Sequence, residues 1–153
     1  MNLEAKIKAD FMTAYKARNA EVAGALRLLQ AALGNAAIEK RGKGDASPLT
    51  DEEVLNVVRR ETKKRKEAIT LYTDGGRADL AEKETKELKV LEVYLPAQMG
   101  EEAIRAEVKT LLKEVGPVDP KDFGKTTGLA MKRLKGRADA ALVQKVLKEE
   151  LGA

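Results

Sequence analysis

The chain has 153 residues, with 29 Lys or Arg against 25 Asp or Glu, which gives a formal net charge of +4. It contains no Cys, His or Trp, which excludes disulfides, zinc sites built from Cys or His, and nucleophilic catalysis by Ser-His or Cys-His pairs. Aromatic residues make up only 3% and charged residues 35%, and the apolar residues are mostly Ala, Leu and Val, a composition that favours helices.

Apolar residues recur at helical spacing along the whole chain, so we expect an all-α fold. Asn19 is a predicted N-cap, and Thr50 with Glu53 has the pattern of a capping box. Pro96 ends the fourth helix, and Asp139 is expected to cap the last one. The seven predicted helices cover about 3–18, 20–40, 51–74, 77–95, 101–115 and 120–135, and the segment after 139.

The helical pattern stops at Pro96 and restarts near Gly100, which predicts a domain boundary. We expect an N-terminal four-helix bundle over residues 1–96 and a smaller three-helix domain over 97–153. No stretch approaches the ~20 apolar residues of a membrane span, and the N-terminus lacks the apolar region of a signal peptide. The sequence therefore predicts a soluble, cytoplasmic protein without a membrane partner, and we assign no cofactor and no metal ligand.

The third predicted helix carries a basic face opposite its apolar arc. One interpretation is a solvated surface that the acids of the fourth helix balance. The other is a stripe that follows the phosphates of a nucleic acid. The cations of this face are Arg59, Arg60, Lys63, Lys64 and Lys66.

Two charges fall on the apolar side of the same helix, one turn apart: Glu61 and Arg65. Arg27 is the only charge in the apolar middle of the second helix. We therefore predict a buried structural ion pair between Arg27 and Glu61, with Arg65 beside it. A catalytic role for the Glu61 carboxylate is the alternative interpretation.

The segment from 123 to 138 has the strongest charge asymmetry of the chain, with five cations and no acid. Cations in the last turn of a helix also suit the helix dipole, so part of this bias has a local structural cause. The other interpretation is a surface that neutralises the phosphates of a folded RNA, since aromatic residues for stacking single strands are scarce. The five cations are Lys125, Lys132, Arg133, Lys135 and Arg137.

Four stretches carry a family resemblance, in order along the chain: GALRLLQAALGNAAIEKR, RRETKKRKEAI, GRADLAEKE followed by LEVYLPAQM, and GKTTGLAMKRLKGRADAALV. Through them the chain resembles the GatB/YqeY family. The resemblance is to the helical tail of the B subunit of the tRNA-dependent amidotransferase, which amidates misacylated Glu-tRNA(Gln) or Asp-tRNA(Asn). It implies a two-part helical fold, a tRNA-contacting role and an association with carbon-nitrogen ligase activity that uses glutamine as amido-N-donor.

The resemblance covers the tail alone, since the ATP-dependent domain and the glutaminase subunit of that enzyme have no counterpart in the sequence. We therefore expect a tRNA-binding accessory protein with no catalytic residue of its own. The basic segment of the second domain is the expected tRNA surface, with help from Arg59, Lys63 and Lys66 across an interdomain cleft. Two alternatives remain: an enzyme with partial amidotransferase activity, and a protein-interaction module that docks on an aminoacyl-tRNA synthetase or an amidotransferase subunit.

Overall fold

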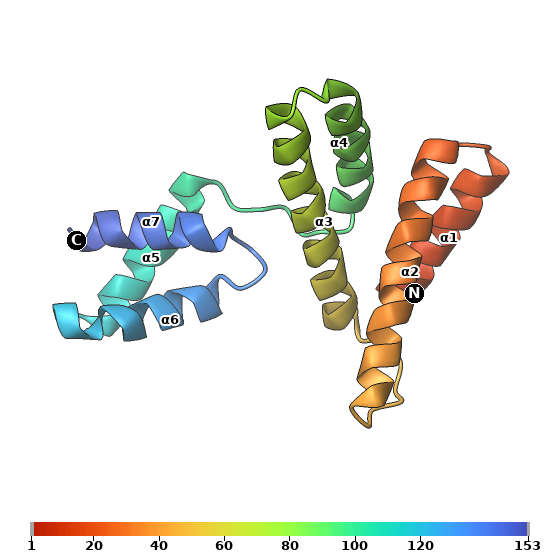
Figure 1. Ribbon diagram of the computed structural model, residues 1–153. Coiled ribbons are helices and arrows are strands. Elements are labelled where there is room, and N and C mark those ends of the chain that lie inside the picture. The colour runs from red at the N-terminus through yellow and green to blue at the C-terminus, as the bar shows by residue number, and fades with distance from the viewer. Residues whose placement is uncertain (1, 153) are drawn as a thin grey trace. The chain divides into compact units, whose positions relative to one another are not determined.

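The computed structural model describes residues 2–152, and all regular structure in this range is helical (Figure 1). The all-α prediction is confirmed. The chain folds into two compact units, Met1–Leu95 (unit 1) and Pro96–Ala153 (unit 2). The helices are α1 (Leu3–Lys16), α2 (Ala20–Gly42), α3 (Asp51–Asp74) and α4 (Ala78–Glu92) in unit 1, and α5 (Glu101–Val115), α6 (Phe123–Arg133) and α7 (Ala140–Leu151) in unit 2, with a 3-10 turn, η1 (Pro120–Asp122), before α6.

Side-chain caps fix where several helices begin, because the first backbone N–H groups of a helix have no partner within it. Asn19 Oδ1 accepts a hydrogen bond from the Val22 N–H at 3.2 Å. The predicted capping box is complete: Thr50 Oγ1 accepts from the Glu53 N–H at 3.2 Å, and Glu53 Oε2 accepts from the Thr50 N–H at 2.7 Å. These local contacts confirm the predicted starts of α2 and α3.

Four helix ends and one helix start differ from the predicted bounds. α2 ends two residues late, at Gly42, and α6 two residues early, at Arg133. α1 ends at Lys16, two residues early, because Arg18 leaves the helical conformation with a φ of 55°. α4 ends at Glu92, and the chain up to Leu95 continues as a turn in which the Leu95 N–H bonds to the Glu92 carbonyl at 3.1 Å. The helix predicted from residue 120 begins instead as η1, because Asp119 accepts from the Lys121 N–H and closes a tighter turn.

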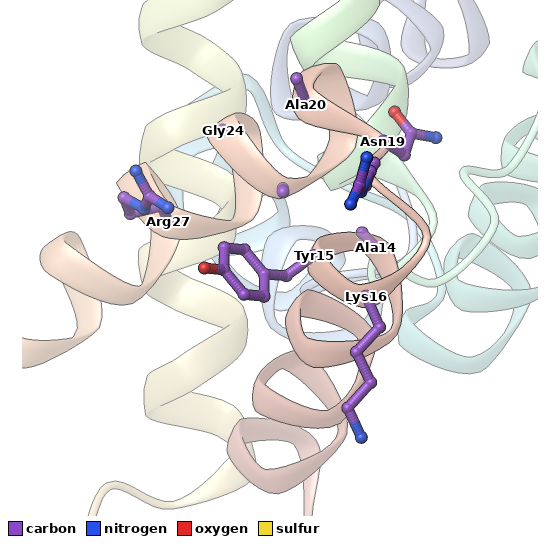
Figure 2. Close-up of a pocket in the computed structure, with 9 residues that line it drawn as sticks. Ala14, Tyr15, Lys16, Asn19, Ala20, Gly24 and Arg27 are labelled. Carbon is purple, nitrogen blue, oxygen red and sulfur yellow. The ribbon is translucent and has the colours of Figure 1, made fainter.

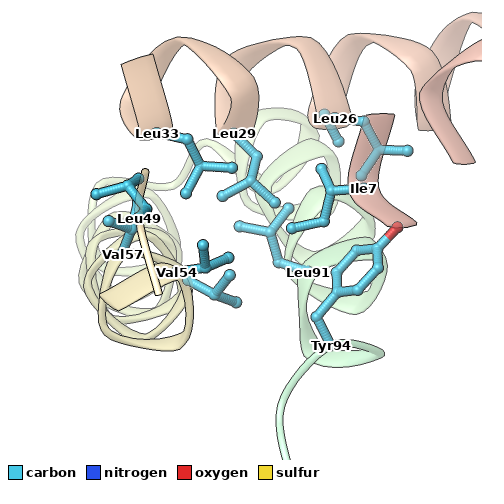
Figure 3. Close-up of a cluster of buried hydrophobic side chains, with 11 residues drawn as sticks. Ile7, Leu26, Leu29, Leu33, Leu49, Val54, Val57, Leu91 and Tyr94 are labelled. Carbon is cyan, nitrogen blue, oxygen red and sulfur yellow. The ribbon is translucent and has the colours of Figure 1, made fainter. Parts of the chain in front are cut away.

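Unit 1 consists of two helical hairpins, α1 with α2 and α3 with α4 (Figure 1). Their apolar faces meet in one core, in which Leu26 and Leu29 of α2 lie against Val54 of α3 and Leu91 of α4, all at most 1% exposed (Figure 3). Burial of such side chains is worth roughly 1.5–3 kcal/mol each, so this core holds the two hairpins together.

Unit 2 has its own core, formed by Ile104 and Val108 of α5 and by Val146 and Leu147 of α7. A charged cluster joins the same two helices at the surface. Arg105 of α5 forms ion pairs with Glu149 at 2.5 Å and Glu150 at 2.7 Å. Hydrogen bonds from Arg105 to these carboxylates raise the pKa of Arg105, so its guanidinium stays charged.

Candidate nucleic-acid interface

The outward side of α6 carries two lysines that have no acidic partner among residues 2–152. Lys125 and Lys132 are seven residues apart, which places them two helical turns apart on one face, with Gly128 and Leu129 between them. Both lysines are exposed, and neither has an ion pair or a side-chain hydrogen bond within the described residues. We call these four residues the α6 lysine face.

The other predicted cations of this segment are tied to partners. Arg133 donates from Nε to Glu107 at 3.2 Å and from NH1 to Glu114 at 2.8 Å, which bridges α6 to α5. Hydrogen bonding to Glu114 raises the pKa of Arg133. Arg137 lies 3.9 Å from Glu107, and Lys135 is exposed but has an interaction of its own. The positive charge of segment 123–138 is therefore partly neutralised by acids that lie 19 or more residues away in the sequence.

Two glycines leave the α6 backbone open to approach. A Cβ atom added at Gly124 or Gly128 would meet no other atom within 4 Å. Alanine would thus fit at both positions in this structure, and glycine inside a helix costs roughly 1 kcal/mol relative to alanine. Packing within the chain therefore gives no reason for glycine at these two positions.

The three predicted cations of α3 differ in their availability. Lys63 is exposed and has no ion-pair partner in residues 2–152, whereas Lys66 lies 3.7 Å from Glu92 of α4. Arg59 is half-buried and donates to the Asn56 side chain at 2.8 Å, and its Nε is buried without an acceptor. Lys64 pairs with Glu61 at 3.0 Å. Lys63 and Arg60 are therefore the exposed cations of the predicted phosphate stripe that have no ion pair within the described residues.

The predicted pair between Arg27 and Glu61 does not form. Glu61 pairs instead with Arg65 of its own helix at 3.1 Å, and Arg65 also lies 3.5 Å from Glu87 of α4. The three side chains are 15%, 7% and 13% exposed, so the buried ionic cluster is real but joins α3 to α4. Arg27 is exposed because it lies on the outer side of α2, with its guanidinium 5.7 Å from the centre of the Phe11 ring.

A hollow that the sequence did not indicate lies at the turn between α1 and α2. Its volume is about 570 Å³, and Tyr15, Arg18, Gly24 and Arg27 are among its lining residues. In Figure 2 the Tyr15 ring extends from the end of α1 toward Arg27 and below Gly24 of α2. We call this feature the α1–α2 hollow.

The described residues offer neither a metal site nor a membrane-spanning helix. Residues 2–152 contain no group of three Asp or Glu side chains placed to hold a metal ion. Within the same range, no helix combines the length and the apolar character needed to cross a bilayer.

Comparison with known proteins identifies the family. A family model described as Yqey-like protein matches residues 4–151, nearly the whole chain. The chain belongs to the YqeY-like protein family. The match extends across both units, so the α6 lysine face and the α1–α2 hollow both lie within the YqeY-like region.

Two fungal proteins are similar to this YqeY-like chain. An uncharacterized protein of Schizosaccharomyces pombe is 35% identical over 95 residues, which cover 62% of this chain and 73% of that protein. Altered inheritance of mitochondria protein 41, mitochondrial, of Pyrenophora tritici-repentis is 29% identical over an alignment that covers 97% of this chain and 80% of that protein.

Proposed function

We propose that this YqeY-like protein is a tRNA-binding accessory factor of tRNA-dependent amidotransfer or aminoacylation that performs no bond-making step itself. The observation that supports this most directly is the α6 lysine face, where two unneutralised ammonium groups flank an open glycine on one side of a helix. The resemblance of the sequence to the amidotransferase tail supplies the choice of tRNA over other polyanions.

The geometry of this face suits the backbone of a folded RNA. Lysines two turns apart span about 10 Å along the helix and can each meet a phosphate, while the missing side chain at Gly128 lets the ribose-phosphate chain come close to the helix. The face contains no aromatic ring for stacking and no Asn, Gln or Arg for reading base edges. Such a surface recognises shape and charge rather than sequence.

This proposal changes the roles of the predicted tRNA-binding residues. Lys125 and Lys132 contact phosphates, and Lys63 is a further candidate on unit 1. Arg133 holds α6 to α5 through Glu107 and Glu114, so its role is structural.

The experiment is a filter-binding assay of the full chain against total tRNA. We expect the Lys125→Ala/Lys132→Ala variant to bind more weakly, by about 5- to 10-fold per lysine near 0.1 M salt. Lys113→Ala is the matched control, because Lys113 is an exposed lysine of α5 that also lacks an ion pair within the described residues. Equal losses in the two variants would show a general charge effect and contradict the assignment to α6.

A second candidate function, a module that docks on a synthetase or amidotransferase subunit, is favoured by the outer side of α2. Leu28 and Ile38 of this helix are large apolar side chains that are 53% and 66% exposed and thus available to a protein partner. Co-purification of such a subunit that is lost in Leu28→Ser/Ile38→Ser, together with unchanged tRNA binding, would favour the docking function.

A further inference from the structure

The α1–α2 hollow has an unusual lining. Its nine lining residues include three cations, one exposed aromatic ring and no carboxylate. The remaining lining residues are small, chiefly alanines and Gly24, so the walls are smooth and leave room for a flat ligand. Its volume of about 570 Å³ lies within the usual range for small-ligand sites.

The cations of the hollow are not neutralised by the acids nearest to them in the sequence. Asp10 accepts the hydrogen bond of the Tyr94 hydroxyl at 2.6 Å, and Glu21 lies 3.9 Å from Lys86. Within the described residues, Arg18 has no ion pair and no side-chain hydrogen bond, and the same holds for Lys16, which extends along α1 in Figure 2. Arg18 and Lys16 therefore bring positive charge to the hollow with no ion pair among residues 2–152, whereas Arg27 also lines a neighbouring hollow that contains Glu21, Glu82 and Glu87.

Phe11 holds the two main groups of the hollow in place. The rings of Phe11 and Tyr15 stack with their centres 6.0 Å apart and their planes 28° apart. The Arg27 guanidinium lies over the same Phe11 ring at 5.7 Å. Phe11 is half-buried against the core of unit 1, so it is a fixed base for both neighbours. Tyr15 is still 58% exposed, which leaves ring surface for a ligand.

Arg18 occupies a backbone position that normally favours glycine. Its φ of 55° is the only positive value of a non-glycine residue in the part of the chain described. The Asn19 N–H bonds to the Ala14 carbonyl at 2.9 Å and the Arg18 N–H to the Tyr15 carbonyl at 3.1 Å, the pattern of a Schellman motif that ends α1. An arginine in this conformation strains the backbone, so stability alone does not explain why residue 18 is arginine. Its side chain places a cation at the hollow.

We propose that the α1–α2 hollow binds one unpaired nucleotide of an RNA strand. The base stacks on the exposed part of the Tyr15 ring, and Arg18 and Arg27 bind the adjoining phosphates. Single-stranded RNA is recognised in this way elsewhere, by aromatic rings that stack splayed bases and by cations that follow the backbone. The proposal rests on RNA binding as the proposed function, but it assigns a second contact, on unit 1, of a different chemical kind from the phosphate contacts of α6.

The test is an amide NMR titration of the full chain with two probes, pentaadenylate and a five-residue abasic ribose-phosphate oligomer. With pentaadenylate we expect shifts at Tyr15, Arg18 and Ala20. Tyr15→Ala should weaken pentaadenylate binding about tenfold and leave the abasic oligomer unaffected, because only the first probe has bases to stack. Arg18→Gly should weaken both probes while the melting temperature stays equal or rises, since glycine accepts the positive φ.

Two controls keep the outcomes distinct. Met12→Ala removes an exposed side chain of α1 outside the hollow, and Arg41→Ala removes one charge at the far end of α2, so both should retain wild-type binding. Unshifted hollow amides, or equal losses for the two probes in Tyr15→Ala, would overturn the inference. If tRNA still binds through Lys125 and Lys132 in that case, the proposed function stands without it. If tRNA does not bind at all, the proposed function fails.

Discussion

Replacing Arg65 with Met tests the buried charges that join α3 to α4. The Arg65 guanidinium lies 3.1 Å from Glu61 and 3.5 Å from Glu87, and all three side chains are at most 15% exposed. Without the cation, two carboxylates remain at most about 9 Å apart, which costs about 2 kcal/mol of repulsion at an effective dielectric constant of about 20. Glu61 keeps its ion pair with Lys64 at 3.0 Å, but Glu87 remains buried without an ion pair among the described residues. We therefore expect a total loss of about 3–5 kcal/mol in the stability of unit 1.

Amide hydrogen exchange measures this loss in the full chain and resolves it by segment. Protection of α3 and α4 should fall by about 150- to 5,000-fold in Arg65→Met, while α5 and α7 in unit 2 serve as an internal reference. The variant that also carries Glu61→Gln and Glu87→Gln should recover most of the protection, because no buried charge is left unpaired. A change below about fivefold in Arg65→Met, or no recovery in the triple variant, would refute this reasoning.

Three further predictions concern single contacts. Tyr94→Phe should cost about 1.5–3 kcal/mol in thermal unfolding, because the Tyr94 hydroxyl donates to the Asp10 carboxylate at 2.6 Å. Burial raises the pKa of Tyr94, so in the wild type this stabilisation should be complete below pH ~10 and decline above it. A Tyr94→Phe protein whose stability declines in the same way at alkaline pH would contradict this prediction. Thr50→Ala should lower the stability of unit 1 by about 1 kcal/mol through loss of the capping box, measured by the urea midpoint. Gly124→Ala and Gly128→Ala should each stabilise unit 2 by about 1 kcal/mol in the same measurement. Both variants should nevertheless weaken tRNA binding in the filter assay, and tighter binding would argue against a close approach of RNA to the α6 backbone.

Local rules were enough to predict the helices from the sequence. The N-caps at Asn19, Thr50 and Asp139 each depend on a side chain that reaches an N–H group three residues on, and all three hydrogen bonds are present. The all-α class and the family followed from apolar periodicity and from motifs that extend along the chain. These features can be predicted without knowing which helices pack against each other.

The site was harder to predict, because its charges are matched across helices. Periodicity placed Glu61 and Arg65 on the buried side of α3, but it could not select Glu87 over Arg27 as their neighbour, since that choice depends on how the hairpins pack. Counting charges along the segment 123–138 likewise missed the acids of α5 that neutralise Arg133. A sequence signal existed for these acids, since two glutamates of α5 stand seven residues apart on one face.

The α1–α2 hollow arises from three features that look ordinary in the sequence. Phe11 and Tyr15 are spaced i, i+4 and have the pattern of core positions in an amphipathic helix, although Tyr15 is 58% exposed. Arg18 gives no sign in the sequence of its positive φ, because glycine is the usual residue there. Arg27 lies near these residues because the turn between α1 and α2 brings the two helices side by side.

The salt dependence of tRNA binding tests the central claim most directly. Each phosphate contact made by a lysine contributes about 1 to the slope of log K against log salt concentration. We predict that the slope of the Lys125→Ala/Lys132→Ala variant is smaller than that of the wild type by about 2, and that Lys113→Ala keeps the wild-type slope. A wild-type slope in the double variant, or no tRNA binding by the intact chain at low salt, would contradict the claim that the α6 lysine face binds RNA.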